Sequence, residues 1–174
     1  GGDNAAVRFT DLAYLVAALL FILALAGLSK QTTASRGNTF GIVGMGLALS
    51  AVFILTVASN HSNVLQMSLF TLLAMAIGAG IGIWRARRVE MTGMPQLIAL
   101  LHSFVGMAAV IVGYNALLES VNNNFPELAR GAALRDIPDM SFHLGEIGLA
   151  VFVGAVTLTG SIVAFLKLSG RISG

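Results

Sequence analysis

Five long apolar stretches, separated by short polar breaks, constrain this chain more than any other feature of its sequence. A transmembrane helix needs about 20 mostly apolar residues. The stretches cover residues 12–28, 40–57, 64–84, 95–118 and 142–168. Only 10% of the residues are charged and 56% are hydrophobic, whereas an ordinary soluble domain has roughly 25% charged residues. The sequence therefore predicts an all-α membrane protein, a bundle of five transmembrane helices.

The apolar stretches leave no segment for a soluble domain. We expect residues 1–11 to form an outer N-terminal segment, residues 12–168 the transmembrane domain and residues 169–174 a cytoplasmic end. The first eleven residues are too polar for a signal peptide and lack an initiator Met, so we expect trimming or processing there. Between the last two stretches, Asn124 and Pro126 predict one short interfacial helix that continues to Leu134.

The basic residues predict how the helices are oriented. Because the predicted spans are odd in number, the two ends of the chain lie on opposite sides of the membrane. One side would collect Lys30, Arg36, Arg85, Arg87, Arg88, Lys167 and Arg171, and the other only Arg8, Arg130 and Arg135. Since cytoplasmic loops carry an excess of Lys and Arg, we expect the N-terminus outside and the C-terminus in the cytoplasm.

Composition also argues against several classes of site. The chain has no cysteine, so it has neither a disulfide framework nor a thiolate metal or redox site. Its net charge of +2 is not gathered into a basic run interleaved with aromatic residues, which argues against binding to nucleic acid.

Small residues recur at helical spacing in four of the stretches. The stripe in the fourth stretch is Ala99, His102, Gly106, Ala109, Gly113 and Ala116, and the stripe in the fifth is Glu146, Ala150, Gly154, Thr157, Ser161 and Ala164. Shorter stripes are Gly41, Gly44, Ala48 and Ala51 in the second stretch, and Ala74, Gly78 and Gly82 in the third. Small faces let helix backbones approach closely in a membrane. We expect the helices to pack by these faces, against one another or against a partner.

His102 is a titratable ring inside an apolar stretch. A charged side chain at membrane depth costs between about 2.5 and 17 kcal/mol, depending on the method, so such a residue is a functional hypothesis by default. By helical rise, His102 and Ser161 each lie roughly 10 Å from the cytoplasmic boundary and share a layer. If the two stripes face each other, Ser161 or Thr157 can bond the ring.

These polar residues together predict a proton path. Glu146 would mark the outer mouth, His102 would gain and lose the proton, and the hydroxyls of Ser161 and Thr157 would orient water. The alternatives are structural. His102 could be a neutral ring held by a hydroxyl or a carbonyl, Glu146 could snorkel to water, and Thr157, Thr159 and Ser161 could bond the carbonyl one turn back.

The other two histidines do not join this path. His143 begins the fifth stretch, roughly 20 Å from the layer of His102 along the membrane normal, so one haem iron cannot bridge the two rings. His61 lies in an outer loop and is interpreted as a solvated residue.

Three runs of the sequence carry a family resemblance. They are AYLVAALLFILALAGLSKQTTASRGNTFGI at residues 13–42, RRVEMTGMPQLIALLHSFVGMAAVIVGYN at residues 87–115 and GAVTLTGSIVAFLKLSG at residues 154–170. They resemble the N-terminal part of the membrane domain in the beta subunit of the proton-translocating NAD(P) transhydrogenases, and the resemblance covers about residues 12–171. It implies that His102 is the proton-linked residue of the family, and that Glu146 and Ser161 match positions implicated in the same path.

The resemblance also implies partners, cofactors and a location. Complete family members pass a hydride between NAD(H) and NADP(H) in soluble domains, so we expect no cofactor bound by this chain and no catalytic activity from it alone. Expected partners are the remainder of the beta subunit, the alpha subunit and a second copy, in a bacterial cytoplasmic membrane. Further family helices and an NADP-binding domain are not in the sequence, so we expect a fragment or one piece of a longer or split subunit.

The chain also departs from the family within the matching region. Gly93 and Gln96 stand where some members carry acidic residues, and the link from Glu119 to Ser141 is long for the family. Two other classes of function stay open. One is a non-catalytic membrane scaffold, in which His102 only cements helix packing. The other is an unrelated ion channel or carrier, which would need a pore lined by charges or exposed carbonyls.

Overall fold

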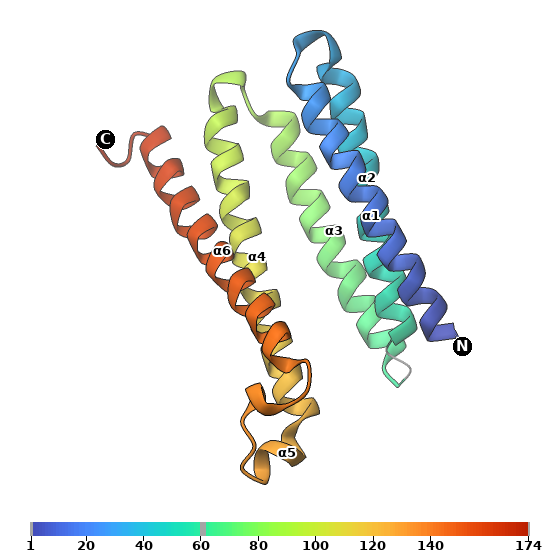
Figure 1. Ribbon diagram of the computed structural model, residues 1–174. Helices are drawn as coiled ribbons and strands as arrows, with labels where there is room; N and C mark the ends of the chain where they lie inside the picture. Colours follow the sequence, from blue (N-terminus) through green and yellow to red (C-terminus); the bar gives the residue numbers. More distant parts are fainter. Residues whose placement is uncertain (1, 60–61, 174) are drawn as a thin grey trace. The chain divides into compact units, whose positions relative to one another are not determined.

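The computed structural model describes residues 2–59 and 62–173, which are almost entirely helical and contain no strand (Figure 1). Within these residues, five helices are long and apolar enough to cross a membrane, which confirms the main prediction from the sequence. The chain divides into two compact units, Gly1–Ala86 and Arg87–Gly174. His61, interpreted above as a loop residue, lies outside the described residues.

The first unit holds three long helices and the second holds two, with a short helix between them. In order, the elements are α1 (Gly2–Leu28), the 3-10 turn η1 (Gln31–Thr33), α2 (Ala34–Ser59), α3 (Val64–Arg88), η2 (Met91–Gly93), α4 (Met94–Asn123), α5 (Phe125–Ala129), η3 (Leu134–Asp136) and α6 (Met140–Leu168). The helices extend past the predicted apolar spans. α1 continues through most of residues 1–11, because helical hydrogen bonding does not stop where the apolar run stops.

The predicted interfacial helix is wrong in its length. α5 begins at Phe125 with Pro126 in its first turn, as expected, but it ends at Ala129 instead of Leu134. Gly131 has a φ of 93°, a left-handed conformation that glycine adopts without steric cost and that breaks a right-handed helix. The separate turn η3 follows, where the Asp136 carboxylate accepts a hydrogen bond from the Ala133 backbone N–H at 3.3 Å.

Small residues join α1 to α2, as the stripe in the second stretch predicts. Gly44 and Ala51 of α2 are buried. Gly37, about two helical turns before Gly44 on the same face, is buried as well. At the hairpin, a Cβ added to Gly27 would lie 2.6 Å from the Cα of Gly37. The two backbones can therefore come this close only because both positions are glycine. The Thr33 hydroxyl donates a hydrogen bond of 2.6 Å to the Gly27 carbonyl and closes the turn.

The stripe in the third stretch has no helix packed on it within the part of the chain that the structure describes. α3 contributes no buried residue. A Cβ built on Gly78 or Gly82 meets nothing within 4 Å. No described residue of the unit Gly1–Ala86 packs on this stripe, and packing against a partner stays a prediction.

A second antiparallel pair, α4 and α6, forms the core of the other unit. Its two backbones cross where Gly106 meets Gly154 and Leu158: a Cβ on Gly106 would lie 2.5 Å from the Leu158 nitrogen and 2.8 Å from the Gly154 oxygen. Where α4 begins and α6 ends, the Gln96 side-chain amide donates a hydrogen bond of 3.0 Å to the Leu168 carbonyl. These contacts fix the register of α4 against α6.

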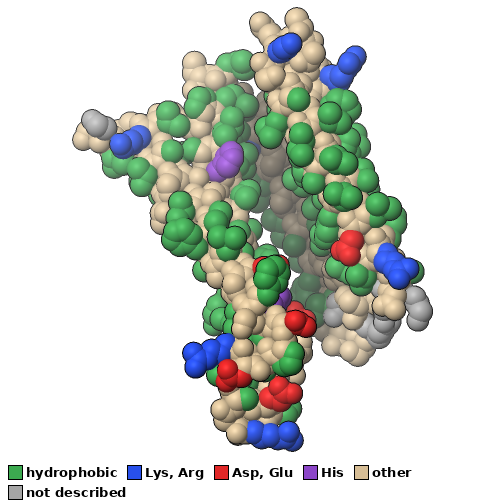
Figure 2. Space-filling view, viewed as in Figure 1, with side chains coloured by type: hydrophobic (Ala, Val, Ile, Leu, Met, Phe, Trp, Pro, Cys, Tyr) green, Lys and Arg blue, Asp and Glu red, His purple; other side chains and the backbone are tan. Residues whose placement is uncertain are grey.

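The surface of each unit fits a lipid environment. Figure 2 shows hydrophobic side chains along the lengths of the helices and charged side chains toward their ends. Large apolar side chains are widely exposed, among them Leu65 at 75% and Phe152 at 68%. A soluble monomer rarely exposes a contiguous apolar surface of this kind, so these faces are suited to a bilayer.

Candidate functional site

His102 lies in the first half of α4 with its ring exposed. Its Nδ1 is 2.8 Å from the carbonyl oxygen of Ile98, one helical turn back. A carbonyl can only accept, so this bond places a proton on Nδ1. In the neutral ring Nε2 is then the basic nitrogen, and it has no partner among the described residues. The ring thus combines a fixed orientation with one nitrogen available to exchange a proton.

The packed face of α4 differs from the predicted stripe. Gly106 and Gly113 are buried, as expected, but the other buried residues of this face include Ser103 and Ser120, and His102 lies beside the face. These four residues form a seam that repeats at about 3.5 residues, as in left-handed helix packing. At its glycines, atoms of α6 fill the space that a Cβ would occupy. A Cβ on Gly113, for example, would meet Val151 Cγ2 at 2.6 Å.

Ser161 and Thr157 lie half-buried on α6 at the edges of this seam. The register set by Gly106 and by the Gln96–Leu168 hydrogen bond brings Ser161 to the level of the turn of α4 that carries His102. No hydrogen bond joins His102 to either hydroxyl in the described residues, and its one described hydrogen bond is to Ile98. The arrangement therefore places the three groups in one layer without direct contact.

Thr159, weighed above as a purely structural residue, behaves as that alternative predicts. Its hydroxyl donates to the carbonyl oxygen of Ala155 at 2.9 Å, one turn back along α6. Ser103 and Ser120 do the same on α4, with hydrogen bonds of 3.1 Å and 2.8 Å to Ala99 and Ala116. These buried hydroxyls are satisfied within their own helix, which lowers the cost of placing them in an apolar seam.

Glu146 stands on the second turn of α6, far from the layer of His102. At 1.5 Å per residue, the helix rises about 22 Å between Glu146 and Ser161. The Glu146 side chain is 59% exposed, and its Oε2 lies 3.8 Å from Nδ1 of His143. Sequence reasoning named Glu146 but set His143 aside. The signal that could have joined them is the spacing in HLGE, because residues three apart are neighbours on a helix.

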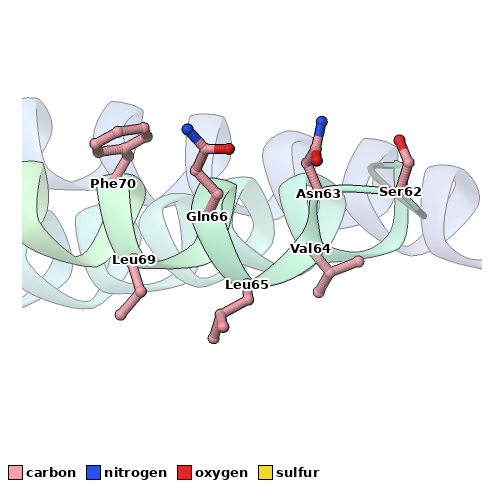
Figure 3. A pocket seen from close by; sticks show the side chains of 7 residues that line it. All are labelled: Ser62, Asn63, Val64, Leu65, Gln66, Leu69 and Phe70. Atoms are coloured by element: carbon pink, nitrogen blue, oxygen red, sulfur yellow. The ribbon is translucent and has the colours of Figure 1, made fainter.

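One further hollow in the surface carries no comparable chemistry. It lies at the beginning of α3 and is lined by Ser62, Asn63, Val64, Leu65, Gln66, Leu69 and Phe70. Figure 3 shows the polar side chains Ser62, Asn63 and Gln66 pointing to the same side as the Phe70 ring. None of the lining residues titrates near neutral pH. In residues 2–59 and 62–173, no group of three or more His, Cys, Asp or Glu side chains gathers as a metal site would require.

Comparison with known proteins gives a consistent result over nearly the whole chain. A family model described as "NAD(P) transhydrogenase beta subunit" matches residues 10–174. The protein named "NAD(P) transhydrogenase subunit beta" of Rhodospirillum rubrum is 44% identical over 165 residues, which are 95% of this chain and 32% of that protein. The same protein from a named strain of that species gives the same values. The chain thus spans about a third of the length of these relatives. No solved structure matches significantly.

Proposed function

Because the chain belongs to the NAD(P) transhydrogenase beta subunit family, we propose that it forms part of the proton-translocating membrane domain of such an enzyme. Here proton movement is coupled to hydride transfer between NAD(H) and NADP(H), which bind in soluble domains of the complete enzyme. The observation that carries the proposal is His102: a ring in an apolar helix with Nδ1 bonded to Ile98 and Nε2 available.

His102 exchanges one proton with one side of the membrane at a time. Nε2 takes a proton from water and the ring becomes imidazolium, while the Nδ1–H bond to Ile98 holds the ring in place. Loss of the same proton to the other side restores the neutral ring. The direction is set by nucleotide occupancy, which must favour one of two states with different proton affinities, since a ligand that binds both states equally shifts nothing.

The other polar groups serve the two ends of this exchange. Ser161 and Thr157, at the edges of the seam, orient water between the layer of His102 and the rest of the path. Glu146 marks the outer mouth, where its exposed carboxylate attracts cations. This assignment follows the polarity of each side chain and its level along α6.

Orientation, partners and location complete the proposal. The excess of basic residues on one side supports an outer N-terminus and a cytoplasmic C-terminus. The bacterial source of the similar proteins supports a bacterial cytoplasmic membrane. The remainder of the beta subunit, the alpha subunit and a second copy supply partner helices, for which the uncovered small stripe of α3 is suited.

Substitution of His102 in the complete enzyme, reconstituted in liposomes, tests the proposal. We expect His102→Ala to leave assembly intact and to abolish proton pumping, measured with a pH-sensitive dye. Leu101→Ala, an exposed neighbour on α4, is the matched control and should pump normally. Pumping by His102→Ala at the normal rate would refute the proposal.

A scaffold role for His102 makes a different prediction. If the ring only cements packing, His102→Asn should lower the thermal stability of the subunit, and transport should fall only in proportion. The exposure of the ring and its bond within its own helix predict instead that stability changes little while pumping is lost.

A further inference from the structure

His143 and Glu146 form a pair of titratable groups that the proposed path uses only in part. They are three residues apart on α6, and Nδ1 of the imidazole lies 3.8 Å from Oε2 of the carboxylate. The side chains are 47% and 59% exposed, so neither is held by packing. Small rotations about their side-chain bonds bring the two atoms to the 2.7–2.9 Å of a charge-assisted hydrogen bond.

The two groups differ in how well they can carry a proton. Near neutral pH a carboxyl group is ionised almost all the time, whereas an imidazole alternates between its neutral and charged forms. A carboxylate alone at the mouth of the path attracts protons but rarely holds one. An imidazole beside it holds the proton for a substantial fraction of the time and is therefore the better carrier.

We propose that His143 is the proton-carrying group at the outer mouth of the path, and that Glu146 is the residue that positions it. This inference rests on the proposed function. A proton from outside water forms an N–H bond at Nε2 of His143, and the ring becomes imidazolium. The N–H bond at Nδ1 stays intact and points toward Oε2 of Glu146, which holds the ring in place. The N–H bond at Nε2 then breaks as the proton passes to a water molecule of the path, which restores the neutral ring in its original tautomer.

Most of the charged groups around His143 are acidic. The elements packed on α6 are η3 and α4, and the charged or titratable groups they and the helix cap carry at this end are Asp139, Arg135, Asp136, Tyr114 and Glu119. Arg135 is engaged with Asp136, at 3.7 Å. The remaining charged groups are acidic.

Distance keeps His143 and His102 distinct in their roles. Between His143 and Leu158, which meets Gly106 one turn from His102, α6 rises about 22 Å. A proton cannot pass directly between the two rings. His143 therefore serves the exchange with outside water, and His102 the exchange within the apolar layer, so substitution of each has a separate signature.

The experiment measures proton pumping by the complete enzyme in liposomes, with variants of the pair. We expect His143→Ala to slow pumping at least about 100-fold, the lower end of the range for loss of a general acid–base group. Because the site is exposed, imidazole added to the compartment that His143 faces should restore most of the rate, and imidazole in the other compartment should not. Glu127→Gln, an acid in the nearby α5, is the control and should leave the rate unchanged.

Glu146 is tested by the pH dependence of the rate. Glu146→Gln removes the carboxylate 3.8 Å from Nδ1 of His143, so we expect half-maximal pumping to move to lower pH, and Glu146→Asp to restore much of the original profile. A merely structural carboxylate would alter stability without moving the profile.

The outcomes separate the two proposals. Normal pumping by His143→Ala at every pH, or a loss that added imidazole does not restore, would overturn the role of His143. Either result is compatible with loss of pumping in His102→Ala. Normal pumping by His102→Ala would instead overturn the proposed function itself, whatever His143 does.

Discussion

The crossing of α4 and α6 at Gly106 predicts a large effect from one added methyl group. In Gly106→Ala the new Cβ would lie 2.5 Å from the Leu158 nitrogen and 2.8 Å from the Gly154 oxygen, where ordinary contact begins near 3.4 Å. Both neighbours are backbone atoms, which cannot rotate away. The two helices must therefore separate by about 0.9 Å, the difference between 3.4 and 2.5 Å.

The cost of that separation follows from the packing it loosens. A radial gap of 0.5–1 Å forfeits a quarter to a half of each atom-pair attraction of about 0.1–0.2 kcal/mol. Over a few tens of pairs in the seam the loss is about 1–3 kcal/mol, the range found for overpacked cores. For a chain of this size, this amounts to a melting temperature lower by about 2–10 °C.

Thermal unfolding of the purified subunit in detergent, followed by circular dichroism, measures this loss. Gly160→Ala is the matched control, since it is the same substitution on α6 at a position with nothing within 4 Å. The control should be neutral or slightly stabilised, because alanine is the better helix former. If the two variants melted at the same temperature, the close crossing of these helices would be refuted.

Three further substitutions probe the other contacts. Gly37→Ala places a Cβ 2.7 Å from backbone atoms of α1 and should destabilise the first unit by about 1–3 kcal/mol, whereas Gly46→Ala, which meets nothing within 4 Å, should not; thermal melting compares them. Gln96→Leu removes the hydrogen bond to Leu168 and should cost about 0.5–1.5 kcal/mol; faster hydrogen exchange at the end of α6 would report it, and unchanged exchange would contradict it. Ser120→Ala removes only a bond within α4 and should change the melting temperature by no more than about 2 °C; a larger drop would show that the hydroxyl reaches beyond its own helix.

The two histidines show how far sequence reasoning went toward the candidate site. The apolar setting of His102 singled it out, since a titratable ring in such a stretch is costly unless it has a use. The sequence argument considers His143 only as a ligand shared with His102, so it does not join His143 to Glu146. Its pairing with Glu146 depends on rotamers as well as spacing, and rotamers are not visible in a sequence.

The sequence by itself determined the number and nature of the long helices. In a lipid environment the backbone must satisfy its own hydrogen bonds, so an apolar run of sufficient length has little choice but to be helical. Glycine and alanine at helical spacing also indicated which face of α2 is covered, because Gly44 and Ala51 proved to be buried.

The tertiary structure decided which side of each helix is covered. On α4 the seam runs through Ser103 and leaves His102 beside it, while on α3 no residue is buried. Several faces of these helices carry small residues, so their composition alone does not select one. The choice falls to the fit of side chains such as Val151 and Leu158 against the glycines of the facing helix, a property of two helices together and of neither sequence alone.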